Sequence, residues 1–108
     1  MINLTLKIKP AEVKEYAVLI KTGISALQGD EYVHYYNLRH LLKKFFDKQF
    51  TINHSRAAVS IRVNINEYES LKYISPVVEA HPYYNALYIS AVEQLEKQVN
   101  NARYLPNW

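Results

Sequence analysis

The chain contains no cysteine and only two glycines among its 108 residues. The missing thiols exclude disulfide bonds, thiolate metal sites and cysteine nucleophiles, and they are typical of a reducing compartment. Gly23 and Gly29 alone cannot supply the glycine-rich loop of a P-loop or Rossmann nucleotide site. Long apolar runs are missing too, because no stretch approaches the ~20 residues of a membrane span. The first residues alternate between polar and apolar and lack the unbroken apolar run of a signal peptide. We therefore expect a cytoplasmic protein without a membrane-bound part.

What the chain does have is an ordinary globular composition, with 49% hydrophobic and 21% charged residues. We therefore expect a single domain over residues 1–108, a length that can bury a core without covalent staples. Its charge is uneven. Residues 1–66 hold ten Lys and Arg against five Asp and Glu, whereas residues 67–108 hold three against five. Asp47 is the only acidic residue within 32–66, which suggests an anionic partner for that part of the chain.

Two segments alternate between polar and apolar residues and predict half-buried strands. The apolar positions are even-numbered in residues 2–9 and odd-numbered in residues 59–65. Phe50 and Ile52 suggest a short third strand in 50–53. Because a lone pair of strands is marginal in water, a sheet edge that pairs with a second copy is a further hypothesis, and it predicts a homodimer.

Three longer segments carry apolar residues at helical spacing, namely 10–28, 31–49 and a stretch that begins at Pro82. Gly29 is placed to end the first helix in a left-handed conformation, and Asp30 is a natural N-cap for the second. The very short connection between these two helices predicts an antiparallel hairpin.

A shorter helix is predicted after the second strand. Asn66 and Glu69 have the spacing of a capping box, and Pro76 limits the helix that follows. Gly23, in the first helix, either permits the close approach of another element or is a mild defect. The resulting order, β-α-α-β-α-α, predicts an α+β fold with a small antiparallel sheet of two or three strands packed with helices.

No catalytic centre or metal site is recognisable in the sequence. His34 and His40 lie six residues apart, on different faces of one helix, and no ligand pattern such as HExxH is present. Glu67 and Glu69 could serve acid–base chemistry, but a charged first helical turn is the simpler interpretation. We therefore expect a protein that is not an enzyme and that uses no cofactor and no metal.

The basic face of the 31–49 helix is the best lead to a ligand. The candidate contacts for an anion or a nucleic acid are Arg39, Lys43, Lys44, Lys48 and Arg62. Such a stripe can engage phosphates, although charged residues on an amphipathic helix usually only face solvent. The sequence has no helix-turn-helix, RNP or zinc-finger pattern, so a nucleic-acid-binding accessory protein is the alternative and not the favoured function.

Aromatic residues give the second lead, because ten tyrosines are many for this length and tyrosine is enriched at protein interfaces. We single out Tyr36, Tyr104 and Trp108 as candidate partner contacts. The last two either fold back onto the body of the domain or dock into a partner. The favoured hypothesis is a small non-enzymatic protein-interaction or regulatory module that self-associates, with a protein partner that no motif identifies.

Overall fold

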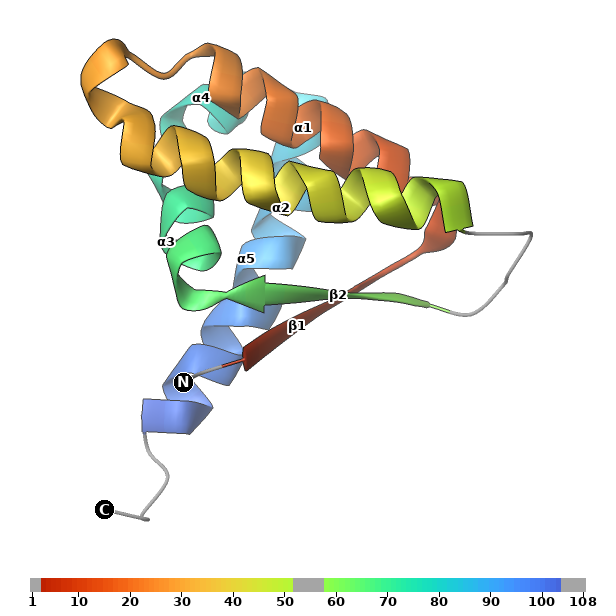
Figure 1. Ribbon diagram of the computed structural model, residues 1–108. Helices are drawn as coiled ribbons and strands as arrows, with labels where there is room; N and C mark the ends of the chain where they lie inside the picture. The colour runs from red at the N-terminus through yellow and green to blue at the C-terminus, as the bar shows by residue number, and fades with distance from the viewer. Residues whose placement is uncertain (1–2, 52–57, 104–108) are drawn as a thin grey trace.

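The computed structural model describes residues 3–51 and 58–103, which form two strands and five α-helices (Figure 1). The elements are β1 (Asn3–Ile8), α1 (Val13–Ser25), α2 (Tyr32–Thr51), β2 (Val59–Asn64), α3 (Ile65–Tyr73), α4 (Ser75–Glu79) and α5 (Pro82–Arg103). The α+β prediction is confirmed, with one additional short helix, α4. Among the described helices, none combines the length and the apolar character that a membrane crossing requires.

The two strands pair antiparallel along their whole length, from Asn3 opposite Asn64 to Ile8 opposite Val59. The alternation buries every second side chain on one face, namely Leu4, Leu6, Ile8, Val59, Ile61 and Val63. The hairpin of α1 and α2 lies over this face, and α5 passes alongside β1 (Figure 1). One hydrophobic core joins the sheet to the helices, and the predicted antiparallel pairing is confirmed.

The connection between α1 and α2 differs from the prediction. Gly29 is not in the left-handed region, and Asp30 is not an N-cap, because Gly29–Glu31 forms a 3-10 turn before α2 begins. The N-cap of this turn is Gln28, whose backbone N–H donates to the Glu31 carboxylate at 2.7 Å. The Glu31 carboxylate therefore caps a 3-10 turn at the point where the sequence predicted that a left-handed glycine would end the first helix.

Other element boundaries also move. α2 continues to Thr51, so Phe50 does not begin a third strand, and the remaining residues suggested for that strand lie outside the described residues. The N-cap of α3 is Asn64 and not Asn66, which shifts the capping box by two residues. Pro76 follows the end of α3 as predicted, but it also lies in the first turn of α4, where its missing N–H costs no hydrogen bond.

Gly23, in α1, lies against Ile74 at the junction of α3 and α4. A Cβ atom at residue 23 would stand 3.1 Å from Cβ and Cγ2 of Ile74, and closer still to its Cδ1. Close approach is therefore the role of this glycine. Gly23→Ala is expected to lower the free energy of unfolding by about 1 kcal/mol, because overpacking (~1–3 kcal/mol) exceeds the ~1 kcal/mol gain in helix propensity. Urea denaturation measures the difference.

The matched control for Gly23→Ala is the same substitution in the Ile74→Ala background, where most of the obstructing side chain is gone. There the alanine should raise the free energy of unfolding by up to ~1 kcal/mol through helix propensity. If Gly23→Ala alone stabilised the protein, α1 would have to be able to move away from Ile74, and close packing would not explain the glycine.

Candidate functional site

The outer edge of β1 is closed by two glutamine side chains of α5. Gln98 accepts from the backbone N–H of Thr5 at 2.8 Å and donates to its carbonyl at 2.7 Å. Gln94 makes the same pair of bonds with Lys7, at 3.0 and 2.8 Å. Each side-chain amide takes the place of a peptide group in a neighbouring strand, so β1 has no open edge at these two residues.

The register then determines which backbone groups of β2 face outward. Thr5 is opposite Arg62, and Lys7 is opposite Ser60. In an antiparallel pair, opposite residues that are not bonded to each other turn their N–H and C=O groups away from each other, so Ser60 and Arg62 turn theirs away from β1. Lys44 of α2 donates to the Arg62 carbonyl at 2.9 Å. In the described part of the chain, the N–H and C=O of Ser60 and the N–H of Arg62 have no partner.

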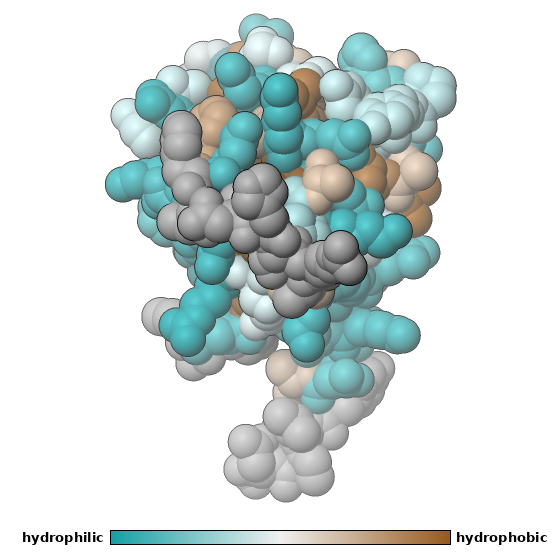
Figure 2. Space-filling view, turned by 90° about the vertical axis from the view of Figure 1, so that its right-hand side faces the viewer, coloured by the Kyte–Doolittle hydropathy of each residue, from teal (hydrophilic) through white to brown (hydrophobic). Residues whose placement is uncertain are grey.

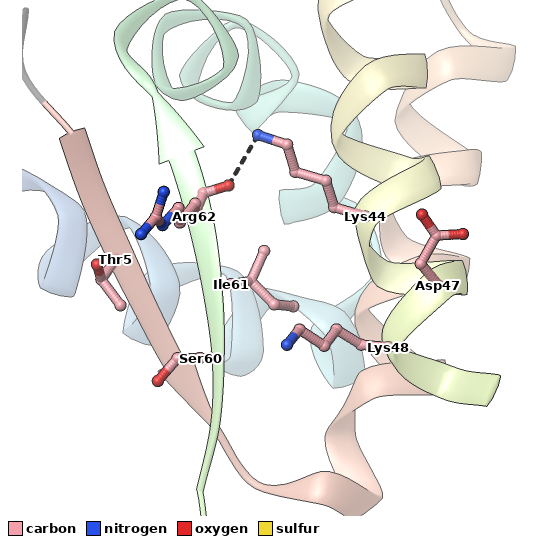
Figure 3. Close-up of a pocket in the computed structure, with 7 residues that line it drawn as sticks. All are labelled: Thr5, Lys44, Asp47, Lys48, Ser60, Ile61 and Arg62. Carbon is pink, nitrogen blue, oxygen red and sulfur yellow. Dashed lines mark hydrogen bonds between the residues drawn. The ribbon is translucent and has the colours of Figure 1, made fainter. Parts of the chain in front are cut away.

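A groove of about 660 Å³ runs along this open edge of β2 (Figure 3). The described residues that line it are Thr5, Lys44, Asp47, Lys48, Ser60, Ile61 and Arg62. Lys44 and Lys48 reach from α2 toward β2, whereas the Arg62 guanidinium points away from α2 (Figure 3). α2 therefore forms one wall of the groove, and the edge of β2 forms the other. In Figure 2, hydrophilic side chains make up most of the coloured surface.

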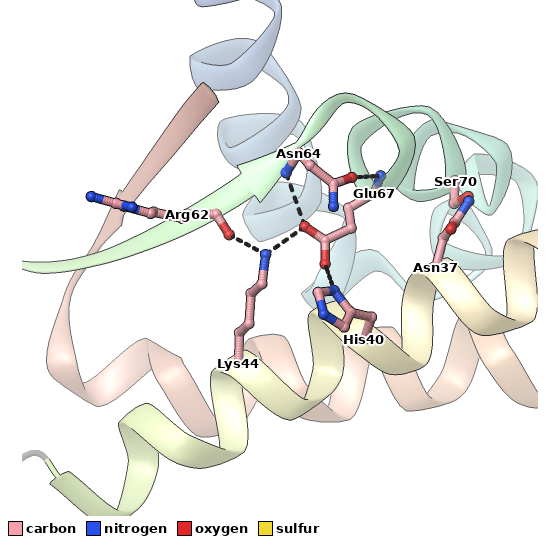
Figure 4. A network of polar contacts seen from close by, with 7 residues as sticks. All are labelled: Asn37, His40, Lys44, Arg62, Asn64, Glu67 and Ser70. Atoms are coloured by element: carbon pink, nitrogen blue, oxygen red, sulfur yellow. Dashed lines mark hydrogen bonds and ion pairs between the residues drawn. The ribbon is translucent and has the colours of Figure 1, made fainter. Parts of the chain in front are cut away.

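Lys44 is held in place by a buried carboxylate. Its ammonium donates to Glu67 at 2.7 Å (Figure 4), and Glu67 is only 1% exposed. Glu67 also accepts from the backbone N–H of Asn64 at 2.9 Å and from Nδ1 of His40 at 2.6 Å. The Asn64 side chain accepts from the Glu67 N–H at 2.7 Å, which completes a capping box. The Glu67 carboxylate thus takes part in the N-terminal cap of α3 and also positions the Lys44 side chain in the groove.

Polar contacts between α2 and α3 continue along both helices. Ser70 is fully buried and accepts from Asn37 at 2.9 Å, and Nδ1 of His34 lies 2.9 Å from the same hydroxyl. His34 also stacks on Tyr73, with 3.9 Å between the ring centroids. The sequence analysis did not predict this interface. In a sequence, a polar residue that packs against another polar residue cannot be distinguished from a polar residue that faces solvent. The only signal was that His34, Asn37 and His40 recur at every third position, so that each is a neighbour of the next on the helix surface.

The five predicted basic contacts do not form one stripe. Three of them line the groove: Lys44, Lys48 and Arg62. Arg39 instead donates to the Tyr35 hydroxyl at 3.1 Å and lies over that ring. Lys43 is exposed and is not among the residues that line the groove. The groove therefore brings together three of the five predicted cations, whereas Arg39 and Lys43 are not among its lining residues.

Of the predicted partner contacts, only Tyr36 lies within the described residues. It is 65% exposed, and Tyr32 meets it edge-on with 6.4 Å between the ring centroids. Tyr104 and Trp108 lie outside the described residues. The exposed rings thus lie near the start of α2, whereas the groove lies along its second half.

Two buried tyrosines act as structural hydrogen-bond donors. Tyr16 donates to the Leu87 carbonyl at 2.8 Å, and Tyr88 donates to the Leu71 carbonyl at 2.7 Å. Burial raises the pKa of Tyr88 to about 12, and burial with nearby carboxylates raises the pKa of Tyr16 as well. Both therefore remain neutral phenols near pH 7. Across the part of the chain that is described, no three histidines, aspartates or glutamates are grouped to hold a metal.

Comparison with known proteins gives no family for this chain, because no family model, no curated protein and no solved structure matches it. In the described residues, the geometry defines a small α+β fold whose two-stranded sheet has one edge closed by glutamines and one open edge beside a groove. A function has to be argued from that site, since a fold alone does not specify one.

Proposed function

We propose that this chain is a non-enzymatic protein-interaction module that binds an extended segment of a partner by strand addition to β2. The observation that carries the proposal is the difference between the two edges of the sheet. Gln94 and Gln98 close β1, whereas Ser60 and Arg62 present two N–H groups and one C=O without a partner in the described chain. Backbone hydrogen bonds to such an edge are the basis of one common mode of peptide recognition.

The groove beside this edge suits an extended peptide. Its volume of about 660 Å³ falls within the ~300–1,000 Å³ of ordinary ligand sites. Ile61 lies at the inner side of the groove, where it is buried in the core, and α2 supplies the opposite wall. Because successive side chains of a strand alternate, an added strand would direct one set of side chains under α2 and the other over the outer face of the sheet.

A single segment fits this edge better than the sheet of a second copy. α2 runs beside the edge, so any strand that pairs with β2 has to enter between the two (Figure 3). A second copy would bring its own α2 and its own Lys44, Lys48 and Arg62 to the same place. Charged side chains at a strand edge oppose pairing between copies. The sequence suggested self-association through a sheet edge, and at β2 this therefore ranks below binding of a partner segment.

Ser60→Pro is expected to abolish segment binding, because proline removes an N–H of the open edge and directs its ring toward the added strand. The fold should persist, since this N–H has no partner in the described chain and edge strands tolerate proline. Ser60→Ala keeps the N–H and is the matched control. The probe is a pool of end-blocked heptapeptides in which valine alternates with serine, glutamine or glutamate, and the amide NMR shifts of residues 59–64 report binding.

Binding by Ser60→Ala that is at least about tenfold tighter than binding by Ser60→Pro would support strand addition. Equal binding by the two variants would contradict it.

A random duplex and a random single strand, titrated at low and high salt, test the nucleic-acid alternative. Salt-sensitive binding that shifts the amides of Arg39 and Lys43 would replace the proposed function. A dimer that Ser60→Pro dissociates would assign the edge to self-association instead.

A further inference from the structure

We infer, on the basis of the proposed strand addition, that the segment bound by β2 is acidic and places a glutamate or aspartate opposite Arg62 on the outer face of the sheet. Arg62 is exposed, and its guanidinium has no hydrogen bond or ion pair in the described chain. The described strand residues of that face are Asn3, Thr5, Lys7, Ser60, Arg62 and Asn64, which include two cations and no carboxylate. The outer face therefore lacks the counter-charge that a partner can supply.

Strand pairing brings such a counter-charge to a defined place. Side chains directly opposite each other in an antiparallel pair share a face, with Cβ atoms ~4.5–5.5 Å apart. A residue of the added strand that pairs with Arg62 therefore projects over the same outer face, within reach of the guanidinium. Opposite charges at this position stabilise the pair, and like charges destabilise it.

The wall formed by α2 adds to the same preference. Lys44 and Lys48 line the groove on that side, and Asp47 is the one carboxylate among the described lining residues. Glu67 balances Lys44 from within the core, and the Arg62 guanidinium points away from α2 (Figure 3). Counted with Glu67, the described lining residues carry three cations against two carboxylates, and this formal excess of positive charge favours an anionic occupant.

The open backbone groups indicate that this anion is a polypeptide and not a nucleic acid. Two of them, the N–H groups of Ser60 and Arg62, are donors, and the third, the C=O of Ser60, is an acceptor. The phosphate groups of a nucleic acid accept hydrogen bonds and do not donate them, so they leave the carbonyl without a partner. A peptide strand offers donors and acceptors in alternation and can satisfy all three.

The test uses the full chain and end-blocked heptapeptides in which valine alternates with glutamate, glutamine or lysine. Two further glutamate peptides carry backbone N-methyl groups, one on the glutamates and one on the valines, because strand direction decides which N–H groups face β2. We expect the glutamate peptide to bind about tenfold more tightly than the glutamine peptide, with an advantage that falls as salt rises. The lysine peptide should bind weakest, and one N-methylated form should not bind.

Variants of exposed cations assign the preference to a residue. Arg62→Gln should reduce the advantage of glutamate over glutamine by about fivefold, and Arg62→Glu should make the lysine peptide the tighter ligand. Lys43→Gln removes the same charge from an exposed position on α2 that does not line the groove, and it should leave both affinities unchanged.

The outcomes separate the two proposals. If the glutamate and glutamine peptides bind equally and one N-methylated glutamate peptide does not bind, the acidic preference is wrong and strand addition stands. If the glutamate peptide binds regardless of either N-methylation, strand addition is wrong. If none of the peptides binds, both are wrong. If Lys43→Gln weakens binding as much as Arg62→Gln does, unspecific attraction accounts for the preference and the pairing with Arg62 is refuted.

Discussion

Glu67→Ala is expected to lower the free energy of unfolding by about 3 kcal/mol. The carboxylate is 1% exposed and accepts from Lys44, from His40 and from the backbone of Asn64. Its removal leaves the ammonium of Lys44, a side chain only 29% exposed, without its counter-charge, and it breaks the capping box of α3. The expected loss is at the low end for a broken buried pair, because the His40 side chain is 63% exposed and can bind water instead. Urea denaturation followed by far-UV circular dichroism measures the change.

Two further variants separate charge from shape. Glu67→Gln keeps an oxygen that can accept from Asn64 but loses the charge, and we expect roughly half of the loss. Glu69→Ala removes an exposed carboxylate of the same helix, and its effect should stay within ~0.5 kcal/mol. If Glu67→Ala were as stable as Glu69→Ala, desolvation of the buried pair would cancel its attraction completely.

The same carboxylate connects the core to the proposed binding edge. Glu67 holds Lys44, and Lys44 donates to the Arg62 carbonyl on β2. Lysines commonly protect strand edges against unwanted pairing, and this one covers a single acceptor while Ser60 stays open. The open part of the edge is therefore short. It allows only a few backbone hydrogen bonds, which suits reversible binding of a segment more than a permanent intermolecular sheet.

Periodicity predicted most of the fold because each element buries one side only. Both strands alternate since one face of the sheet lies against the core, and the apolar stripes of α1, α2 and α5 recur at helical spacing. Periodicity does not contain information on which polar groups meet. Lys44 was interpreted as part of a basic face, yet it contacts a buried carboxylate 23 residues away in the chain. The sequence could therefore predict a set of charged residues for the site, but not which of them contact one another.

Local motifs were ambiguous where the structure depends on distant contacts. Asn64 with Glu67 and Asn66 with Glu69 have the same capping-box spacing, and spacing alone does not choose between them. The first box is the one that forms, and it is also the one whose carboxylate meets Lys44 and continues the core. The choice is thus made by tertiary packing, which no local pattern records.

The contacts of the two glutamines that close β1 were the hardest feature to predict from the sequence. Residues four apart on a helix are ~6.0 Å apart along its axis, and residues two apart on a strand are ~6.8 Å apart. Gln94 and Gln98 can therefore bond Lys7 and Thr5 at the same time, provided that α5 runs along β1 (Figure 1). Helical periodicity gives no indication of such a match, because a glutamine beside an apolar stripe is an ordinary boundary residue.

The double variant Gln94→Ala/Gln98→Ala is expected to lose about 2–3 kcal/mol of stability and to self-associate. Each of the four lost hydrogen bonds contributes ~1 kcal/mol net, less at Lys7, where water can replace the amide, than at partly buried Thr5. Gln98→Ala alone should therefore cost more than Gln94→Ala alone. Opening the edge of β1 also exposes a row of unpaired N–H and C=O groups, which promotes pairing between copies. Urea denaturation and sedimentation over a range of concentrations measure the two effects.

Glu93→Ala/Lys97→Ala is the matched control for this pair, because it changes two exposed residues with the same spacing on the same helix. It should alter stability by no more than ~0.5 kcal/mol and leave the mass unchanged. If the glutamine double variant kept the stability and the mass of this control, the side-chain amides would not be what closes β1. The contrast between a closed β1 and an open β2 would then lose its physical basis, and strand addition at β2 would need independent support from the peptide measurements.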